Sequence, residues 1–207
     1  MKTEETRPAA SPLLILASGS AYREELLHRL HLPFLCDSPE IDETPLANEQ
    51  PEQTALRLAR LKAEAVSPRH PGSLIIGSDQ VATLDHIQIG KPGTHDKALE
   101  QLLLMRGREV IFHTALCLLD NRPGAMQAMQ LTNVQTKVRF RWLPEAELDA
   151  YLRIEQPYDC AGSAKNEALG ITILEAIDSS DPTALTGLPL IALTSMLRHA
   201  GITFFAT

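Results

Sequence analysis

Short apolar runs alternate with amphipathic segments along this chain. The run at 13–17 is too short for a helix and stops at Ser18-Gly19-Ser20, so it predicts a buried strand. Positions 21–30 then keep Leu26, Leu27 and Leu30 on one side, which predicts a helix capped by Ser20. The same patterns predict strands at 34–36, 74–77, 81–84, 87–89, 110–119, 127–141 and 171–176, and helices at 51–66, 96–105, 144–154 and 190–200.

The order of these elements indicates the fold class. Strands alternate with helices near both ends and hairpins fill the middle, which is typical of an α/β or α+β protein with a mixed, twisted sheet flanked by helices. The turn at Asp85-His86 joins one such hairpin. Because no linker interrupts the pattern, we expect a single domain over 12–207 with two lobes and a cleft, and a disordered tail over 1–11.

Composition narrows the function classes. The 207 residues include 19 basic and 26 acidic side chains, a net charge of -7, and 44% of them are hydrophobic. This balance is typical of a soluble globular protein and argues against nucleic-acid and membrane partners. The first residues lack the features of a signal peptide, so we expect a cytoplasmic location. The three cysteines are too widely spaced for a disulfide framework or a zinc site.

The first candidate for chemistry is the segment LASGSAYREELL at 16–27. A strand that passes through small residues into a helix leaves backbone N–H groups and the positive end of the helix dipole free for a phosphate. Ser18 and Ser20 add hydroxyl groups, and Arg23 adds a positive charge. The alternative is a capped turn without a ligand, and the segment alone does not decide between the two.

Carboxylates supply the second candidate. Asp79 follows the apolar run at 74–77, which places it at the carboxyl end of the predicted strand, where it can activate water or bind a metal. The alternative is an aspartate that only forms a turn. The acidic cluster Glu40, Asp42 and Glu43 offers oxygen ligands for a hard divalent cation, or else forms a solvated loop.

Lysines are scarce, with six against thirteen arginines. Lys91 lies in the turn GKPGT, where its ammonium group can reach a phosphate. Lys62 lies at the edge of the apolar stripe of the helix at 51–66, and either binds phosphate or rests on the surface. Lys165 is expected to be an exposed loop residue.

Together these segments resemble the Maf family of nucleotide pyrophosphatases. The matching motifs are LASGSxxRxELL from 16, EIDE at 40–43, RLAxxKA at 57–63, IIGSDQ at 75–80, GKP at 90–92, VxFRxL at 138–143, CAGS at 160–163 and GLPL at 187–190. The resemblance implies an elongated, two-lobed Maf/ITPase-like fold with a central cleft, and a homodimer. It also implies hydrolysis of a nucleoside triphosphate to its monophosphate and pyrophosphate.

The resemblance also implies roles for individual residues. Asp79 would be the general base. The phosphates would be bound by Ser18, Ser20, Arg23, Lys62 and Lys91. Glu43 and Asp79 would hold a divalent cation, Mg, Mn or Co.

Three further positions are similar to the branch of the family that favours 7-methylguanosine triphosphate: Tyr22, Gln80 and Glu167. A carboxylate such as Glu167 can accept both donors on the guanine edge, and an aromatic ring such as Tyr22 attracts a cationic methylated base by about 0.5 to 2 kcal/mol. Tyr22 stands where the branch usually has tryptophan, so we expect weaker stacking, and Ala164 stands where family members have tyrosine or phenylalanine. The alternative is that Tyr22 packs under the phosphate loop and that Glu167 is a surface charge on a loop.

Two other functions are open on the sequence alone. One is hydrolysis of UTP, dTTP or other noncanonical triphosphates. The other is a nucleotide-responsive regulator of cell division and septum formation that acts by binding. Because pure binding needs no general base, Asp79 favours hydrolysis.

Overall fold

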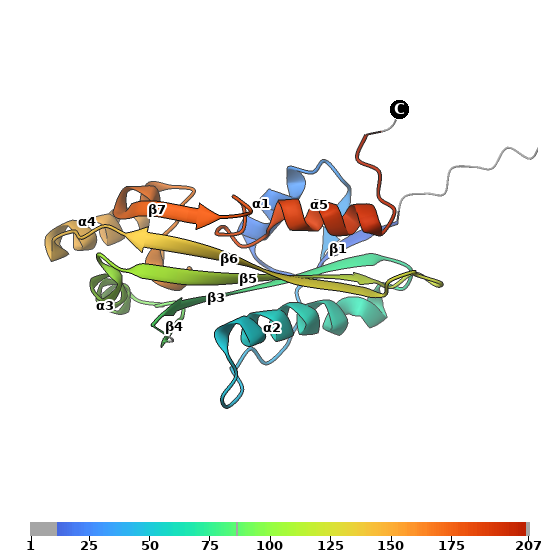
Figure 1. Ribbon diagram of the computed structural model, residues 1–207, viewed down its shortest axis with the longest axis horizontal. Coiled ribbons are helices and arrows are strands. Elements are labelled where there is room, and N and C mark those ends of the chain that lie inside the picture. Colours follow the sequence, from blue (N-terminus) through green and yellow to red (C-terminus); the bar gives the residue numbers. More distant parts are fainter. Residues whose placement is uncertain (1–11, 86, 206–207) are drawn as a thin grey trace, which may run out of the picture.

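The computed structural model describes residues 12–85 and 87–205, and a mixed sheet runs through this part of the chain (Figure 1). The strands are β1 (Leu14–Leu16), β2 (Phe34–Cys36), β3 (Leu74–Leu84), β4 (Ile87–Ile89), β5 (Glu109–Asp120), β6 (Met129–Phe140) and β7 (Leu174–Ser179). The helices are α1 (Ala21–His28), α2 (Pro51–Val66), α3 (His95–Met105), α4 (Glu145–Glu155) and α5 (Leu190–His199), with short 3-10 helices at Ser67–Arg69, Ala161–Ser163 and Leu169–Ile173. The predicted tail at 1–11 and His86 lie outside the described residues.

The strands follow the order β2-β1-β3-β5-β6-β7, with β4 beside β3. β1 is parallel to both of its neighbours, β2 and β3. The pairs β3–β5, β5–β6 and β6–β7 are antiparallel. This confirms the predicted mixed sheet flanked by helices.

Helices cover the two faces of the sheet unequally, and the molecule is elongated along its long strands (Figure 1). One face packs on α2, through small residues such as Ala55, Ala59 and Ala63. The opposite face carries α1 and α5 at one end of the strands, and α3 and α4 at the other end. Three clusters of buried apolar side chains result, one under α2 and two on the opposite face, and β3 and β5 contribute to all three. They can do so because side chains alternate between the two faces of each strand.

Strand β3 differs from the prediction in one respect that matters for function. The sequence predicts a break at 78–80, whereas β3 runs unbroken from Leu74 to Leu84 and pairs with β5 from Leu74 to Thr83. Asp79 therefore lies in the middle of a strand, and the expected place at a carboxyl end is wrong. The polar side chains are tolerated there because Ser78 and Gln80 hydrogen bond to other segments.

The other edge of β3 is shared by two short strands. β1 covers residues 74–76 and β4 covers residues 82–84, and within the described chain these registers leave residues 77–81 without a strand partner on that edge. β1 is parallel to β3 and β4 is antiparallel, so the segments that follow β1 and β4 both run toward this opening. The opening places the candidate residues of both segments next to Asp79.

Gly77 allows α2 to pack closely on β3. A Cβ atom at this position would lie 2.1 Å from the backbone oxygen of Ala59. We therefore expect Gly77→Ala to lower the free energy of unfolding by about 2 kcal/mol, since helix and strand would have to separate. Urea unfolding measures the change. Gly90→Ala is the control, because its Cβ meets nothing within 4 Å, and equal stability of the two variants would contradict the prediction.

One predicted strand is displaced. Residues 171–173 belong to a 3-10 helix, and the strand predicted at 171–176 begins at Leu174 instead. Ile171 is 51% exposed, so the apolar run does not mark a buried strand. The strand continues into polar residues up to Ser179, which an edge position permits. The other predicted helices and strands are confirmed to within a few residues at their ends.

Candidate active site

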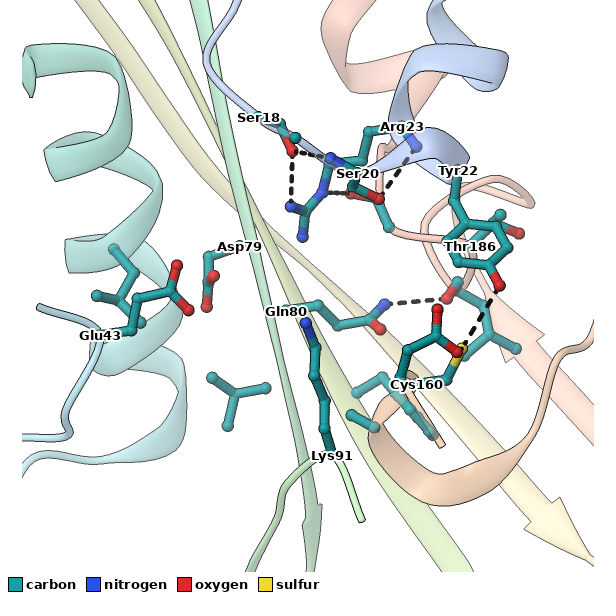
Figure 2. Close-up of a pocket in the computed structure, with 18 of the residues that line it drawn as sticks. Ser18, Ser20, Tyr22, Arg23, Glu43, Asp79, Gln80, Lys91, Cys160 and Thr186 are labelled. Carbon is teal, nitrogen blue, oxygen red and sulfur yellow. Dashed lines mark hydrogen bonds between the residues drawn. The ribbon is translucent and has the colours of Figure 1, made fainter. Parts of the chain in front are cut away.

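A cavity of about 760 Å³ lies beside the open edge of β3 (Figure 2). It is lined by the segments that follow β1 and β4, by α2 and β3, and by the loops at 159–167 and 185–187. All ten predicted site residues line it: Ser18, Ser20, Tyr22, Arg23, Glu43, Lys62, Asp79, Gln80, Lys91 and Glu167. Glu40 and Asp42 do not line the cavity, so only Glu43 of the acidic cluster belongs to the site.

Asp79 and Lys62 form the buried centre of the site. The Lys62 ammonium on α2 donates to Asp79 Oδ1 at 2.6 Å, and Glu43 Oε1 lies 2.8 Å from the same nitrogen. The Lys62 and Asp79 side chains are 8% and 9% exposed, whereas Glu43 is 57% exposed. Lys62 therefore bridges a buried carboxylate and a carboxylate at the surface. The sequence predicts only a phosphate contact or a surface position for Lys62, and not these two ion pairs.

Burial raises the pKa of Asp79 above the ordinary value of an aspartate, because desolvation penalises the charged carboxylate. The positive charges of Lys62 and Arg23 act in the opposite direction, and nearby Glu43 adds to the increase. A carboxylate with a raised pKa is a stronger base than one in water. Asp79 is thus suited to accept a proton.

The turn after β1 positions the guanidinium of Arg23. Arg23 Nε donates to the carbonyl of Gly187 at 2.9 Å, and Arg23 Nη1 donates to Ser18 Oγ at 3.3 Å (Figure 2). Ser20 caps α1 by accepting from the Arg23 amide, as predicted. Burial lowers the pKa of Arg23, and Asp79 is the largest charge that opposes this. Arg23 and Asp79 therefore line the same cavity and are close enough for their charges to interact.

Lys91 follows β4 and is exposed, and its amino group points into the cavity toward Gln80 (Figure 2). Ser18, Arg23 and Lys91 thus surround the opening from two chain segments. Such a group of donors and positive charges is suited to the oxygens of a polyphosphate.

The amide of Gln80 has one defined orientation. Gln80 Nε2 donates to Thr114 Oγ1 at 2.9 Å, and it lies 3.1 Å and 3.0 Å from the carbonyl oxygens of Ala184 and Leu185. Carbonyl oxygens only accept, so the nitrogen must face them. The Gln80 carbonyl oxygen is therefore the group left for a ligand, and it is an acceptor.

Tyr22, Cys160 and Glu167 also line the cavity. Cys160 Sγ lies 3.9 Å from the Tyr22 hydroxyl (Figure 2). Burial raises the pKa of Cys160 to about 11, so its thiol stays protonated at neutral pH. Partial burial also raises the pKa of Glu167. Besides Gln80, the cavity thus offers an aromatic ring and a carboxylate.

The two carboxylates of the site fit a divalent cation that is coordinated partly by the protein and partly by the phosphates of a substrate. Asp79 and Glu43 converge from β3 and from the loop before α2. Among residues 12–85 and 87–205, no group of three or more histidine, cysteine, aspartate or glutamate side chains forms a closed metal site. Mg²⁺ is usually bound by one or two carboxylates together with phosphates and waters, and this donor set matches that pattern.

Sequence reasoning missed several residues of the site. Ser78 and Thr114 are fully buried and hydrogen bond to the carbonyls of Gly187 and Ala184. Ser78 lies inside the motif IIGSDQ without a role of its own there, and Thr114 lies in none of the motifs. Thr186 accepts from Asn166 at 3.4 Å. The prediction for Lys165 is wrong, since its side chain is only 19% exposed and lies near Glu155 and Asp159. Only the folded chain brings these segments together.

Comparisons with known proteins give consistent results. A family model described as Maf-like protein matches residues 13–200. The chain is 64% identical over 203 residues to a 7-methyl-GTP pyrophosphatase of Cupriavidus metallidurans, covering 98% of each chain. It is also 64% identical to a 7-methyl-GTP pyrophosphatase of Burkholderia pseudomallei, covering 94% of this chain and 90% of the relative.

Among solved structures, a HAM1 protein from Coxiella burnetii has a similar fold. The two superpose with a TM-score of 0.50 at 18% identity, over 91% of this chain and 100% of the other. Within the described ranges of this chain, no helix has the length and apolar character needed to cross a membrane.

Proposed function

The chain belongs to the Maf-like family, and on this premise we propose that it is a pyrophosphatase that hydrolyses 7-methyl-GTP to 7-methyl-GMP and pyrophosphate. Relatives at 64% identity carry the name 7-methyl-GTP pyrophosphatase. The observation that carries the proposal is that all ten residues selected from the sequence line one cavity. Removal of a modified nucleotide from the cellular pool is the role that follows.

Asp79 is the general base of this proposal. Its carboxylate takes a proton from water as the water oxygen attacks the α phosphorus. The bond between this phosphorus and the oxygen that bridges to the β phosphorus breaks, and pyrophosphate leaves. Burial and the contact with Lys62 hold the carboxylate in one position. A base that cannot rotate loses little entropy when it accepts the proton.

Positive groups bind the triphosphate in this proposal. Arg23 has its Nε and Nη1 donors occupied by Gly187 and Ser18, which leaves Nη2 for a phosphate oxygen. Lys91 reaches the cavity from the other side, and Lys62 adds charge from α2. Because negative charge grows on the leaving pyrophosphate, these groups stabilise the transition state more than the ground state.

We assign the divalent cation to Glu43 and Asp79. A bound Mg²⁺, Mn²⁺ or Co²⁺ would neutralise phosphate charge and draw electrons from the bond that breaks. Lys62 holds both carboxylates in place for this cation.

Base selection rests on two acceptors. The Gln80 amide leaves its oxygen for the ligand, and Glu167 contributes a carboxylate. The Watson–Crick edge of guanine carries N1–H and an exocyclic amine, both donors, whereas uracil carries one donor between two acceptors. The two acceptors therefore favour guanine over a pyrimidine.

The methyl group adds a positive charge to the guanine ring. Tyr22 also lines the cavity, and a tyrosine ring stabilises a cation by about 0.5 to 2 kcal/mol. This corresponds to an advantage of roughly 2-fold to 30-fold over unmethylated GTP.

Product analysis tests the reaction type. We expect purified protein with Mg²⁺ or Mn²⁺ to convert 7-methyl-GTP into 7-methyl-GMP and pyrophosphate, resolved by anion-exchange chromatography. Formation of 7-methyl-GDP and inorganic phosphate, or no product at all, would refute the proposed reaction.

Glu167→Gln tests the base-reading role. This substitution replaces one carboxylate oxygen by an NH2 group and so removes an acceptor. We expect the ratio of kcat/KM for 7-methyl-GTP to that for UTP to fall about 10-fold, which corresponds to the loss of one hydrogen bond to a charged group. Glu175→Gln on β7 is the matched control, since Glu175 is exposed and does not line the cavity. An unchanged ratio in Glu167→Gln would mean that Glu167 does not read the base.

A further inference from the structure

Glu43 lies on an irregular segment whose position depends on side-chain contacts. Residues 37–50 connect β2 with α2 and form no helix or strand, and most of them are exposed. Glu43 reaches the site from this segment to contact Lys62. A long exposed connection loses conformational entropy when it is ordered, so its position must come from specific contacts.

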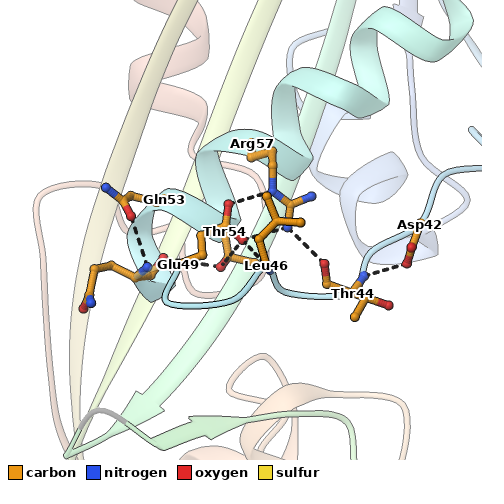
Figure 3. A network of polar contacts seen from close by, with 8 residues as sticks. Asp42, Thr44, Leu46, Glu49, Gln53, Thr54 and Arg57 are labelled. Carbon is orange, nitrogen blue, oxygen red and sulfur yellow. Dashed lines mark hydrogen bonds and ion pairs between the residues drawn. The ribbon is translucent and has the colours of Figure 1, made fainter.

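The backbone next to Glu43 is held from both sides (Figure 3). The Thr44 amide donates to Asp42 Oδ1 at 2.9 Å, and the Thr44 carbonyl accepts from Arg57 Nη2 at 3.1 Å. The first contact closes a turn around Glu43. The second ties this turn to α2, the helix that also carries Lys62.

Arg57 is itself held in place by Glu49. Arg57 Nε and Nη2 donate to the two oxygens of Glu49 at 2.6 Å and 2.8 Å (Figure 3). Their side chains are 16% and 9% exposed, so water screens this pair little. These hydrogen bonds lower the pKa of Glu49 to about 2. A two-point arginine–carboxylate contact of this kind is among the strongest and most directional in proteins.

Further contacts complete the anchor. Glu49 Oε2 accepts from the Thr54 hydroxyl at 2.9 Å and from the Leu46 amide at 3.1 Å. Five residues of the loop and the first turns of α2 thus form one network around Arg57: Thr44, Leu46, Glu49, Thr54 and Arg57 itself. Arg57 does not line the cavity.

We propose that Arg57 is a positioning residue for the reaction, which holds Glu43 at the site by binding the Thr44 carbonyl while Glu49 orients its guanidinium. The proposal rests on the proposed function, because it assigns Glu43 to cation binding. Loss of Arg57 would free the loop and weaken cation binding, while Asp79 and the phosphate-binding groups would stay in place. Lysine cannot replace arginine here, since a single ammonium group cannot contact both Glu49 oxygens and Thr44 in this planar geometry.

A double-mutant cycle tests the proposal. The variants are Arg57→Gln, Glu43→Gln and their combination, with kcat and KM for 7-methyl-GTP measured over a range of Mg²⁺ concentrations. We expect Arg57→Gln to raise the Mg²⁺ concentration for half-maximal activity about 10-fold to 100-fold, with kcat largely restored at saturating Mg²⁺. Because Arg57 acts through Glu43, the double variant should match Glu43→Gln alone.

Controls separate this role from general stability. Arg60→Gln is the matched control, since Arg60 lies on the same helix, pairs with exposed Glu64 and does not line the cavity. If Arg57→Gln does not fold, the same cycle is measured with Glu49→Gln in its place, since this substitution weakens the contact with Arg57 and leaves the arginine present. Losses that add in the double variant, or an Arg57→Gln variant that behaves as Arg60→Gln, would overturn the proposal. Absence of pyrophosphate release by the unmodified protein would instead refute the proposed function.

Discussion

Asp79→Asn should lower kcat for 7-methyl-GTP hydrolysis roughly a thousandfold, the middle of the range for loss of a general base. Asparagine has nearly the same shape and can still accept the hydrogen bond from Lys62, but it cannot take a proton from water. Nucleotide affinity measured without a divalent cation should stay equal or increase, because a negative charge disappears from a cavity that binds phosphates. Pyrophosphate release and equilibrium binding of 7-methyl-GTP measure the two effects separately.

Asp85→Asn is the matched control for this prediction. Asp85 directly follows β3, is 71% exposed at its side chain, pairs with Arg108 and does not line the cavity. We expect its kcat to equal that of the unmodified protein. Near-normal turnover by Asp79→Asn would show that another group accepts the proton, and a loss of binding would show that the variant disturbs the whole site.

Lys62→Met should reduce both stability and activity. The substitution removes the cation from a pair whose side chains are 8% and 9% exposed, leaving the Asp79 carboxylate buried and unpaired. Breaking such a pair costs about 3 kcal/mol, and urea unfolding measures it. Activity should fall at least about 100-fold, because Asp79 and Glu43 lose their common partner and the phosphates lose a charge.

The double variant Lys62→Met with Asp79→Asn tests the reason. It removes both charges, so we expect it to regain most of the stability that Lys62→Met loses, while remaining inactive. Lys97→Met, at an exposed position on α3, should leave stability unchanged. If the double variant were less stable than Lys62→Met, the unpaired charge would not be the cause of the loss.

Much of the fold could be predicted because local pattern and tertiary structure agree. The apolar run before Ser18 is buried as β1, and Pro51 begins α2 as its restricted φ angle favours. The apolar stripe of α2 meets the sheet through alanines and leucines. The long antiparallel pair of β5 and β6 follows from two β-rich runs around one turn.

The course of β3 could not be predicted from local pattern. Gly77, Ser78 and Gln80 have the composition of a turn, and only contacts with distant segments allow them to stay extended. Ser78 donates toward the carbonyls of Ala115 and Gly187, which lie 37 and 109 residues away. Tertiary hydrogen bonds of this kind override local propensity.

The sequence identifies the residues of the site more readily than it predicts the contacts between them. Charged and hydroxyl groups in short motifs stand out, whereas the donor direction of Gln80 depends on carbonyls about 100 residues away. The sequence predicts Lys62 only at the edge of an apolar stripe, because its burial against Asp79 depends on how α2 packs on β3. The homodimer, the cytoplasmic location and the domain bounds 12–207 stay predictions of the sequence.

Substrate competition tests the central claim most directly. Pyrophosphate release by the unmodified protein would be measured for 7-methyl-GTP, GTP, UTP and dTTP at one Mg²⁺ concentration, and compared as kcat/KM. We predict that 7-methyl-GTP gives the highest value, with GTP lower by roughly 2-fold to 30-fold and both pyrimidine nucleotides lower still. A higher value for UTP or dTTP would contradict base reading by Gln80 and Glu167, and no release from any of the four would contradict the enzymatic function.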